Sequence, residues 1–349
     1  MDFSFLLRTL LTIAAIGVLM IVHEGGHYLA ARAFGMRVTK FSIGFGPTLY
    51  KKTPAGSETE FRIGLLPFFA YVYIAGMNPY EEVADDDPAL FPNKGVFARI
   101  AAIAAGPIAN YLFASLVVFG VAMVGWPEEA TPTEMVVGEI QPGSAAATAG
   151  VHVGDVIIEA GGRPVRGILD VQRVTQPRAG QATDYVVRRA GRAVRLVITP
   201  KNDGGVGRIG VSQLATYDYV PQPAGRAAYI AVRWPWERVM LQLHGIGEMI
   251  RGATIRNLGG PVRMVQEGAK HVERGSTFFL LFVAFVSTGL ALFNALPFPM
   301  LDGGRLLFLA FELVTRRKAD PKVEAAVHTV GFLFLLGLMV IVTFQDFQH

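Results

Sequence analysis

Four long apolar runs dominate the pattern of hydrophobic and polar positions along the chain. Each approaches or exceeds the roughly 20 residues that a helix needs to cross a bilayer. The runs extend over about Phe3 to Phe34, Ile100 to Gly125, Phe278 to Leu296 and Ala325 to Phe344. We therefore expect a polytopic α-helical membrane protein with four transmembrane helices, in segments 1–36, 97–126, 276–300 and 325–345. A cleaved signal peptide is the alternative for the first run, but Met1-Asp2 lacks the basic character typical of one.

The segment between the first two spans, residues 37–96, is apolar but too irregular to cross the bilayer. Lys40 to Phe45 and Glu60 to Leu65 both alternate between polar and apolar residues, which predicts a β-hairpin. The next run, Leu66 to Met77, supplies only about a dozen apolar residues, too few to span the bilayer alone.

Only the connection between the second and third spans is long enough for a folded domain. A strand-like segment Met135 to Ile140, a helical stretch Ile168 to Arg178 and a hairpin around Ala190-Gly191 predict a mixed α/β domain over residues 131–201. Residues 202–275 are expected to form a linker and amphipathic helices, and residues 301–324 the motif around Asp302 and a cytoplasmic loop.

Composition agrees with a membrane protein, because 52% of the 349 residues are apolar and only 17% are charged. A soluble protein has about a quarter of its residues charged. The net charge is +4 with scattered basic residues, so we expect no nucleic-acid partner. The absence of cysteine excludes disulfides, thiolate ligands and a cysteine nucleophile, so His and carboxylate side chains must hold any metal.

The first span carries the motif His23-Glu24-Gly25-Gly26-His27. Residues four apart lie on one face of a helix, so both imidazoles can bind one cation while Glu24 reaches a water molecule beside it. The alternative is two histidines in a structural ion pair. It has little support, because ionisable groups inside a membrane span are costly and usually functional.

Asp302, just after the third span, is the best candidate for a third ligand. Spans one and three run in the same direction, so their C-terminal ends emerge on the same side of the membrane, at the depth of His23 and His27. The N-terminal part of span two, with Gly106 and Asn110, lies on that side as well. The alternative for Asp302 is a helix N-cap ahead of the following apolar run.

These motifs together resemble the site-2 protease family of intramembrane zinc metalloproteases, and specifically its bacterial RseP-type members, which regulate sigma-factor release. The resemblance extends over nearly the whole chain. It depends on His23-Glu24-Gly25-Gly26-His27, on Gly106-Pro107 with Asn110, and on Asn294 with Pro297, Pro299 and Leu301-Asp302-Gly303. Two features differ from the family pattern: relatives often have a bulky residue in place of Gly25, and some have two PDZ domains where this chain has room for one.

The resemblance implies a Zn²⁺ cofactor bound by His23, His27 and Asp302, with Glu24 as the catalytic acid and base. It implies Asn294 and Asn110 as substrate-binding residues, and a hairpin associated with the membrane beside the active site. The implied substrate is the membrane-spanning segment of a single-pass protein that another protease has already shortened, such as an anti-sigma factor or a remnant signal peptide. Residues 131–201 resemble a PDZ domain, which either restricts access or recruits substrate ends.

Orientation follows from the basic residues of the short segments. The side that carries the motifs has eleven of them, against only Arg8 in the tails of the other side: Arg37, Lys40, Lys51, Lys52, Arg62, Lys94, Arg305, Arg316, Arg317, Lys318 and Lys322. We expect a multi-pass protein of the bacterial cytoplasmic (inner) membrane, with the active site towards the cytoplasm and the PDZ-like domain outside.

The predicted function is zinc-assisted hydrolysis of a peptide bond within or near a transmembrane segment. The alternative is a non-proteolytic membrane scaffold that binds partners through the PDZ-like domain and has a structural metal site. The presence of Glu24 argues against the scaffold, because a structural metal site needs no base beside it.

Overall fold

The computed structural model describes residues 3–78, 86–130, 133–252 and 259–347, which form two compact units. The first unit comprises Met1–Gly125 with Pro221–His349, and the second Trp126–Val220. The helices of the first unit are α1 (Phe3–Ala33), α2 (Val96–Gly125), α5 (Ala224–Ile250), α6 (Pro261–Arg274), α7 (Ser276–Ala295), α8 (Asp302–Thr315) and α9 (Pro321–Asp346), with the short 3₁₀ turn η1 (Phe91–Asn93). Its strands are β1 (Val38–Lys52) and β2 (Glu60–Ile74).

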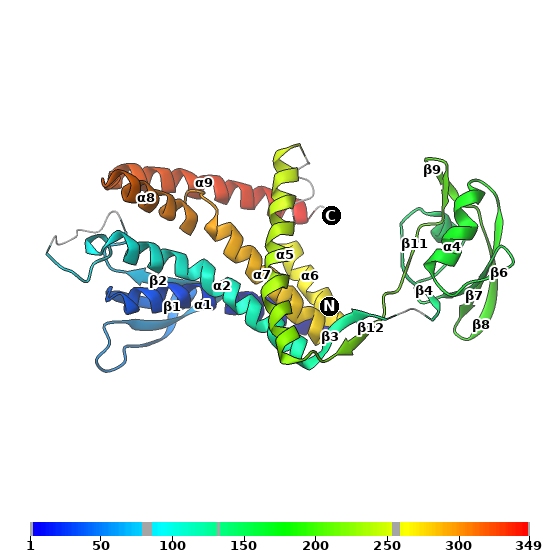
Figure 1. Ribbon diagram of the computed structural model, residues 1–349, viewed down its shortest axis with the longest axis horizontal. Coiled ribbons are helices and arrows are strands. Elements are labelled where there is room, and N and C mark those ends of the chain that lie inside the picture. The colour runs from blue at the N-terminus through cyan, green and yellow to red at the C-terminus, as the bar shows by residue number, and fades with distance from the viewer. Residues whose placement is uncertain (1–2, 79–85, 131–132, 253–258, 348–349) are drawn as a thin grey trace. The chain divides into compact units, whose positions relative to one another are not determined.

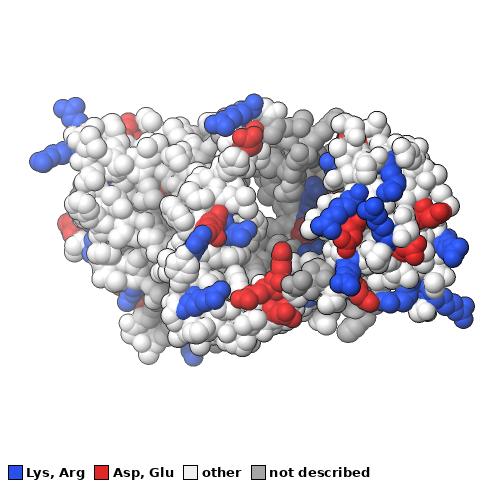
Figure 2. Space-filling model, turned by 45° about the vertical axis from the view of Figure 1, so that its right-hand side comes forward, with Lys and Arg blue, Asp and Glu red and all other residues white. Residues whose placement is uncertain are grey.

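Helices α1, α2, α7 and α9 are long and apolar enough to cross a membrane, so the prediction of four apolar helices is confirmed. Helix α2 packs against both α1 and α7, and Figure 1 shows these helices alongside one another. Leucines such as Leu112 and Leu116 on α2 are exposed, as expected of positions that face lipid instead of water. Large uncharged areas are visible on the face shown in Figure 2.

Strands β1 and β2 form an antiparallel hairpin that is longer than the predicted one. Residues 40–43 of β1 have partners on both sides, in Glu60–Ile63 and in Ala70–Tyr73, because both strands bend. Gly44 has a φ of 91° at the bend in β1, a conformation that favours glycine. The apolar run after Leu65 therefore continues β2, and β2 packs against α1.

The second unit contains β3 (Trp126–Glu129), β4 (Met135–Ile140), α3 (Ala145–Thr148), β5 (Val156–Ala160), β6 (Arg163–Pro164), α4 (Ile168–Thr175), η2 (Gln176–Arg178), β7 (Thr183–Arg189), β8 (Arg192–Ile198), β9 (Lys201–Asp203), β10 (Val206–Arg208), β11 (Val211–Gln213) and β12 (Tyr217–Val220). Its main sheet has the order β11-β4-β5-β7-β8, with β6 paired to β5. Met135, Ile157 and Tyr185 are fully buried in a core of its own. Basic and acidic side chains are interspersed on the face in Figure 2.

This unit is longer than the predicted domain of residues 131–201. Strand β11 pairs with β4, and β12 pairs with β3, so the chain after residue 201 still belongs to the unit. The predicted first residue, 131, lies outside the described residues. These pairings join segments about 80 residues apart, and such long-range pairing leaves no local periodicity in the sequence.

Candidate metal centre

His23 and His27 lie on one face of α1, because residues four apart in a helix are neighbours. Each side chain is buried, and the two Nε2 atoms are 3.2 Å apart. The spacing in the motif therefore brings two imidazole nitrogens together inside a bundle of apolar helices.

Asp302 is the first residue of α8, a helix that occupies much of the segment 301–324 that was expected to be a loop. Asp302 completes a triangle with these histidines. Its Oδ2 lies 3.1 Å from Nε2 of His23 and 3.3 Å from Nε2 of His27. Ligand atoms of a tetrahedral zinc ion, each about 2.0–2.1 Å from the metal, are about 3.3 Å from one another. Two imidazoles and one carboxylate are also a donor set typical of catalytic zinc. The three residues that the sequence predicted as ligands thus fit zinc in both spacing and chemistry.

The other ring nitrogen of His27 has a partner that determines its protonation. Nδ1 of His27 lies 2.8 Å from the carbonyl oxygen of Ala102 on α2. A carbonyl oxygen only accepts hydrogen bonds, so Nδ1 carries the proton and Nε2 keeps the lone pair that a metal needs. Helix α2 therefore orients His27 for metal binding.

Asn110, also on α2, lies behind His23. Its Nδ2 is 3.3 Å from Nδ1 of His23, and its Oδ1 has no hydrogen-bond partner among the described residues. Turning the amide by 180° exchanges these two atoms and lets Oδ1 accept a hydrogen bond from the N–H at Nδ1, which leaves Nε2 unprotonated for a metal. Asn110 is completely buried, so its position suits orientation of His23, whereas the sequence suggested contact with substrate.

The close approach of α1 and α2 depends on glycine. A Cβ atom at Gly106 would lie 2.3 Å from Nε2 of His27, and one at Gly26 would lie 2.3 Å from the carbonyl oxygen of Ala105. Both distances are far below van der Waals contact. By contrast, a Cβ at Gly25 would meet nothing within 4 Å, so the absence of the family's bulky residue disturbs no contact there.

Glu24 lies beside the triangle but is hydrogen-bonded to the hairpin. Its Oε2 accepts a hydrogen bond of 3.0 Å from the backbone N–H of Val72 on β2. The triangle formed by His23, His27 and Asp302 is the metal-binding group found among the described residues, and Glu24 is not part of it. This arrangement suits a carboxylate that acts on a water molecule instead of binding the metal.

Asn294 is half-buried near the C-terminal end of α7, in the last turns before the segment that leads to Asp302. Its Nδ2 donates a hydrogen bond of 3.0 Å to the carbonyl oxygen of Leu290, one turn earlier in the same helix. Its Nδ2 is thus bonded within α7, and contact of Asn294 with substrate stays a prediction.

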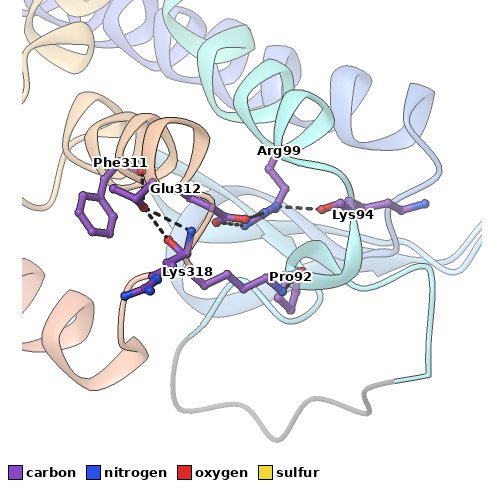
Figure 3. Close-up of polar contacts among 8 residues, drawn as sticks. Pro92, Lys94, Arg99, Phe311, Glu312 and Lys318 are labelled. Atoms are coloured by element: carbon purple, nitrogen blue, oxygen red, sulfur yellow. Dashed lines mark hydrogen bonds and ion pairs between the residues drawn. The ribbon is translucent and has the colours of Figure 1, made fainter.

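Sequence reasoning missed a buried ion pair between α2 and α8. The Arg99 guanidinium makes two contacts with the Glu312 carboxylate, one of them 3.0 Å long, and its Nε donates to the carbonyl oxygen of Lys94 (Figure 3). Close by, Lys318 donates to the carbonyl oxygen of Pro92. The signal was present, because Glu312 interrupts an otherwise apolar run of α8, but its partner is 213 residues away.

The pair borders a cavity of about 400 Å³, which the side chains of Arg305 and Glu324 also line. Arg305, one turn after Asp302, donates from Nη1 to the carbonyl oxygen of Met77 at 3.3 Å. The start of α8 is therefore connected to the end of the hairpin as well as to the metal centre.

Comparison with known proteins identifies the family. The model of peptidase family M50 matches residues 11–338. The chain is 33% identical over 354 residues to a Synechocystis protein named as a zinc metalloprotease, with 97% of this chain and 95% of the relative covered. A Nostoc protein of the same name is 30% identical, with 97% and 96% covered. The regulator of sigma-E protease RseP from Escherichia coli is 27% identical over 448 residues, with 99% of each chain covered.

These similarities extend over the full chain and favour the protease over the scaffold. The family and the matching relatives depend on zinc, which the triangle of donor atoms on α1 and α8 fits. The chain therefore belongs to peptidase family M50, the site-2 protease type, and is a zinc metalloprotease.

Proposed function

We propose that this protein is an intramembrane endopeptidase that cleaves a single-pass membrane protein within or near its transmembrane segment. The observation that carries the proposal is the triangle of His23, His27 and Asp302, which lies among helices apolar enough to cross a membrane. Because the metal-binding atoms lie inside such a bundle, we expect this protease to act on segments that enter the bilayer. In this proposal another protease first removes the substrate's external domain, as for an anti-sigma factor or a remnant signal peptide.

In this proposal His23, His27 and Asp302 hold the zinc ion. When bound, zinc supplies Lewis acidity, which makes a water molecule more acidic and polarises the carbonyl group of the scissile peptide. Glu24 takes the proton of the attacking water and returns it to the leaving amide nitrogen. Ala102 and Asn110 keep the imidazoles in the tautomer with Nε2 unprotonated.

The hairpin is the proposed binding site for the scissile segment. The N–H of Val72 on β2 points at Glu24 and forms its hydrogen bond there. An unwound substrate segment that pairs with this part of β2 would therefore lie against the catalytic carboxylate. Unwinding is necessary, because a helix keeps its amides in internal hydrogen bonds and shields the peptide from attack.

The proposed location is the bacterial cytoplasmic membrane, with the metal centre towards the cytoplasm. The basic residues of the short segments support this orientation, including Arg305 on α8 and Lys322 at the start of α9. The unit Trp126–Val220 would then lie outside the cytoplasm, between α2 and α5 along the chain.

We propose that this outer unit is a PDZ-like domain that acts as a gate. Its short strands, its two helices and a cavity of about 250 Å³ between α4 and residues 206–211 support the comparison with PDZ domains. A peptide could bind in that cavity beside β11, which is an edge of the sheet. We favour the gate, because a substrate span held by the hairpin already has affinity and the active site lies on the other side of the bilayer.

Cleavage of a single-pass substrate in reconstituted vesicles, with and without a chelator, tests the proposal. Glu24→Gln should retain about one zinc per chain and lose cleavage, because an amide cannot accept the water's proton. Asp302→Asn should lose zinc and cleavage together. Loss of zinc in Glu24→Gln, or full activity of Asp302→Asn at limiting zinc, would contradict the assigned roles.

A further inference from the structure

One face of α9 supports the loop that leads to Asp302. His328, Gly331 and Phe334 are spaced three residues apart and lie on that face. They contact three consecutive loop residues in reverse order, namely Met300, Pro299 and Phe298. His328 is an ionisable residue inside an apolar helix long enough to span a membrane, and such a residue is costly there unless it has a purpose.

The contact of His328 is a hydrogen bond to the loop backbone. The N–H of Met300 donates to Nδ1 of His328 at 2.8 Å. Met300 has a φ of 80°, a left-handed conformation that a side chain other than glycine rarely adopts. Such a conformation is strained and persists only where surrounding contacts hold it. His328 provides one of these contacts. Its ring also packs against that of Phe308 on α8, with the two ring centroids 5.8 Å apart.

Gly331 and Phe334 hold the same loop through packing. A Cβ atom at Gly331 would lie 2.4 Å from Cβ of Pro299, so the backbone of α9 and the loop are in direct contact. The ring centroids of Phe334 and Phe298 are 5.7 Å apart. On its other side the loop touches the start of α8, where a Cβ at Gly304 would lie 2.4 Å from the carbonyl oxygen of Phe298.

The loop is therefore enclosed between α9 and the first turn of α8. Asp302 lies two residues after Met300 and two before Gly304, so it cannot shift independently of these contacts. A metal ligand must be held within about 0.5 Å of its productive position. Neither His23 nor His27 can compensate for a displaced Asp302, because α1 and α2 fix both.

We propose that the α9 face formed by His328, Gly331 and Phe334 positions the Asp302 carboxylate for zinc binding, with His328 as a positioning residue. The inference rests on the proposed role of Asp302 as a zinc ligand. The proposed support predicts that substitutions on this face of α9 weaken zinc binding, although these residues contact neither substrate nor metal.

Two glycines of α9 offer a matched test. Gly331→Ala places a methyl group against Pro299, whereas a Cβ at Gly337, on the same helix, meets nothing within 4 Å. Zinc dissociation constants are measured by competition with a chelator on the full-length protein in detergent. We expect Gly331→Ala to bind zinc about 10–100 times more weakly than wild type, as for other residues that orient metal ligands, and Gly337→Ala to bind it equally well.

Substitution of His328 provides a second test that does not depend on packing. His328→Ala removes the acceptor for Met300 and should weaken zinc binding, while His328→Asn keeps an acceptor oxygen near the position of Nδ1 and should restore most of the affinity. Restored zinc affinity in His328→Asn would show that the effect of His328→Ala comes from the lost hydrogen bond. Thermal unfolding of the same samples reports any general loss of stability.

Asp302→Asn separates this inference from the proposed function. If zinc affinity is unchanged in Asp302→Asn, the ligand assignment fails, and the proposed support fails with it. If Asp302→Asn loses zinc while Gly331→Ala and His328→Ala retain wild-type affinity, only the role of α9 is overturned. Equal weakening by His328→Ala and His328→Asn would overturn the role of the hydrogen bond.

Discussion

Arg99 and Glu312 form a buried ion pair that joins α2 to the helix carrying Asp302. Glu312 is on α8, ten residues after Asp302, which corresponds to about 15 Å along the helix. Arg99 is on α2, one turn before Ala102, whose carbonyl oxygen orients His27. Helix α2 thus contacts the histidine side of the metal centre directly, and the ion pair drawn in Figure 3 joins it to the helix that carries Asp302.

Breaking this ion pair should destabilise the fold more than replacing it. Glu312→Gln leaves the buried Arg99 charge uncompensated, and we expect it to lower the free energy of unfolding by about 3–5 kcal/mol. The double variant Arg99→Met with Glu312→Leu removes both charges and should be close to wild type. Denaturant unfolding of the detergent-solubilised protein measures both.

An exposed ion pair between other helices is the control for that prediction. Glu273 on α6 contacts Arg8 on α1 at 2.6 Å, with 67% of its side chain exposed. Water screens such a pair, so Glu273→Gln should change stability by at most about 1 kcal/mol. Equal effects of Glu312→Gln and Glu273→Gln would contradict the importance of the buried pair.

Two glycines close to the histidines should respond differently to the same substitution. Gly106→Ala places a methyl group on Nε2 of His27, so zinc affinity should fall by about 10–100-fold or more, together with activity. Gly25→Ala meets open space and should keep zinc and activity, with a helix stabilised by up to about 1 kcal/mol. Zinc content after dialysis against a chelator compares the two, and wild-type retention by Gly106→Ala would contradict the close packing of α1 and α2.

Removal of most of the unit Trp126–Val220 tests whether this unit is a gate or recruits substrates. Glu129 on β3 pairs with Tyr217 on β12, so replacing residues 130–216 by Asn-Gly should close these strands into a hairpin. For a gate, we expect this deletion to allow cleavage of substrates that still have their external domain, with trimmed substrates cut as before. Slower cleavage of trimmed substrates alone would instead indicate recruitment. One reconstituted assay with both substrates makes the comparison.

The unit Trp126–Val220 should lose stability in acid through Asp155. Its carboxylate is 1% exposed, and two contacts of 2.7 and 2.8 Å from Arg189 lower its pKa below the ordinary value of 3.8. A carboxylate whose pKa is lower in the folded state than in the unfolded state stabilises the fold at pH values above its unfolded-state pKa. That contribution is complete above about pH 5 and declines as the pH falls through 4 and below.

Urea unfolding of a fragment with residues 126–220, which has its own core, measures this effect between pH 3 and 6. The midpoint of wild type should fall more steeply in acid than that of Asp155→Asn, which has no titrating group at this position. Parallel pH profiles would show that the contacts with Arg189 do not contribute.

The local features of this protein could be predicted from its sequence. The spacing of His23 and His27 places them on one helix face whatever surrounds the helix, because the period of the α-helix is fixed. The four apolar helices follow from run length alone. Even the meeting of Asp302 with the histidines could be predicted, since the number of spans determines on which side each helix ends.

Contacts between distant segments were decided only by the tertiary structure. The hydrogen bond from Val72 to Glu24 depends on how the hairpin packs against α1, and the second unit ends at Val220 because β11 and β12 return to β4 and β3. The pairing of Met300 with His328 depends on where α9 packs. Hydrophobic periodicity specifies which residues are buried and in which element, but a buried polar group shows its partner only when the helices and strands have packed together.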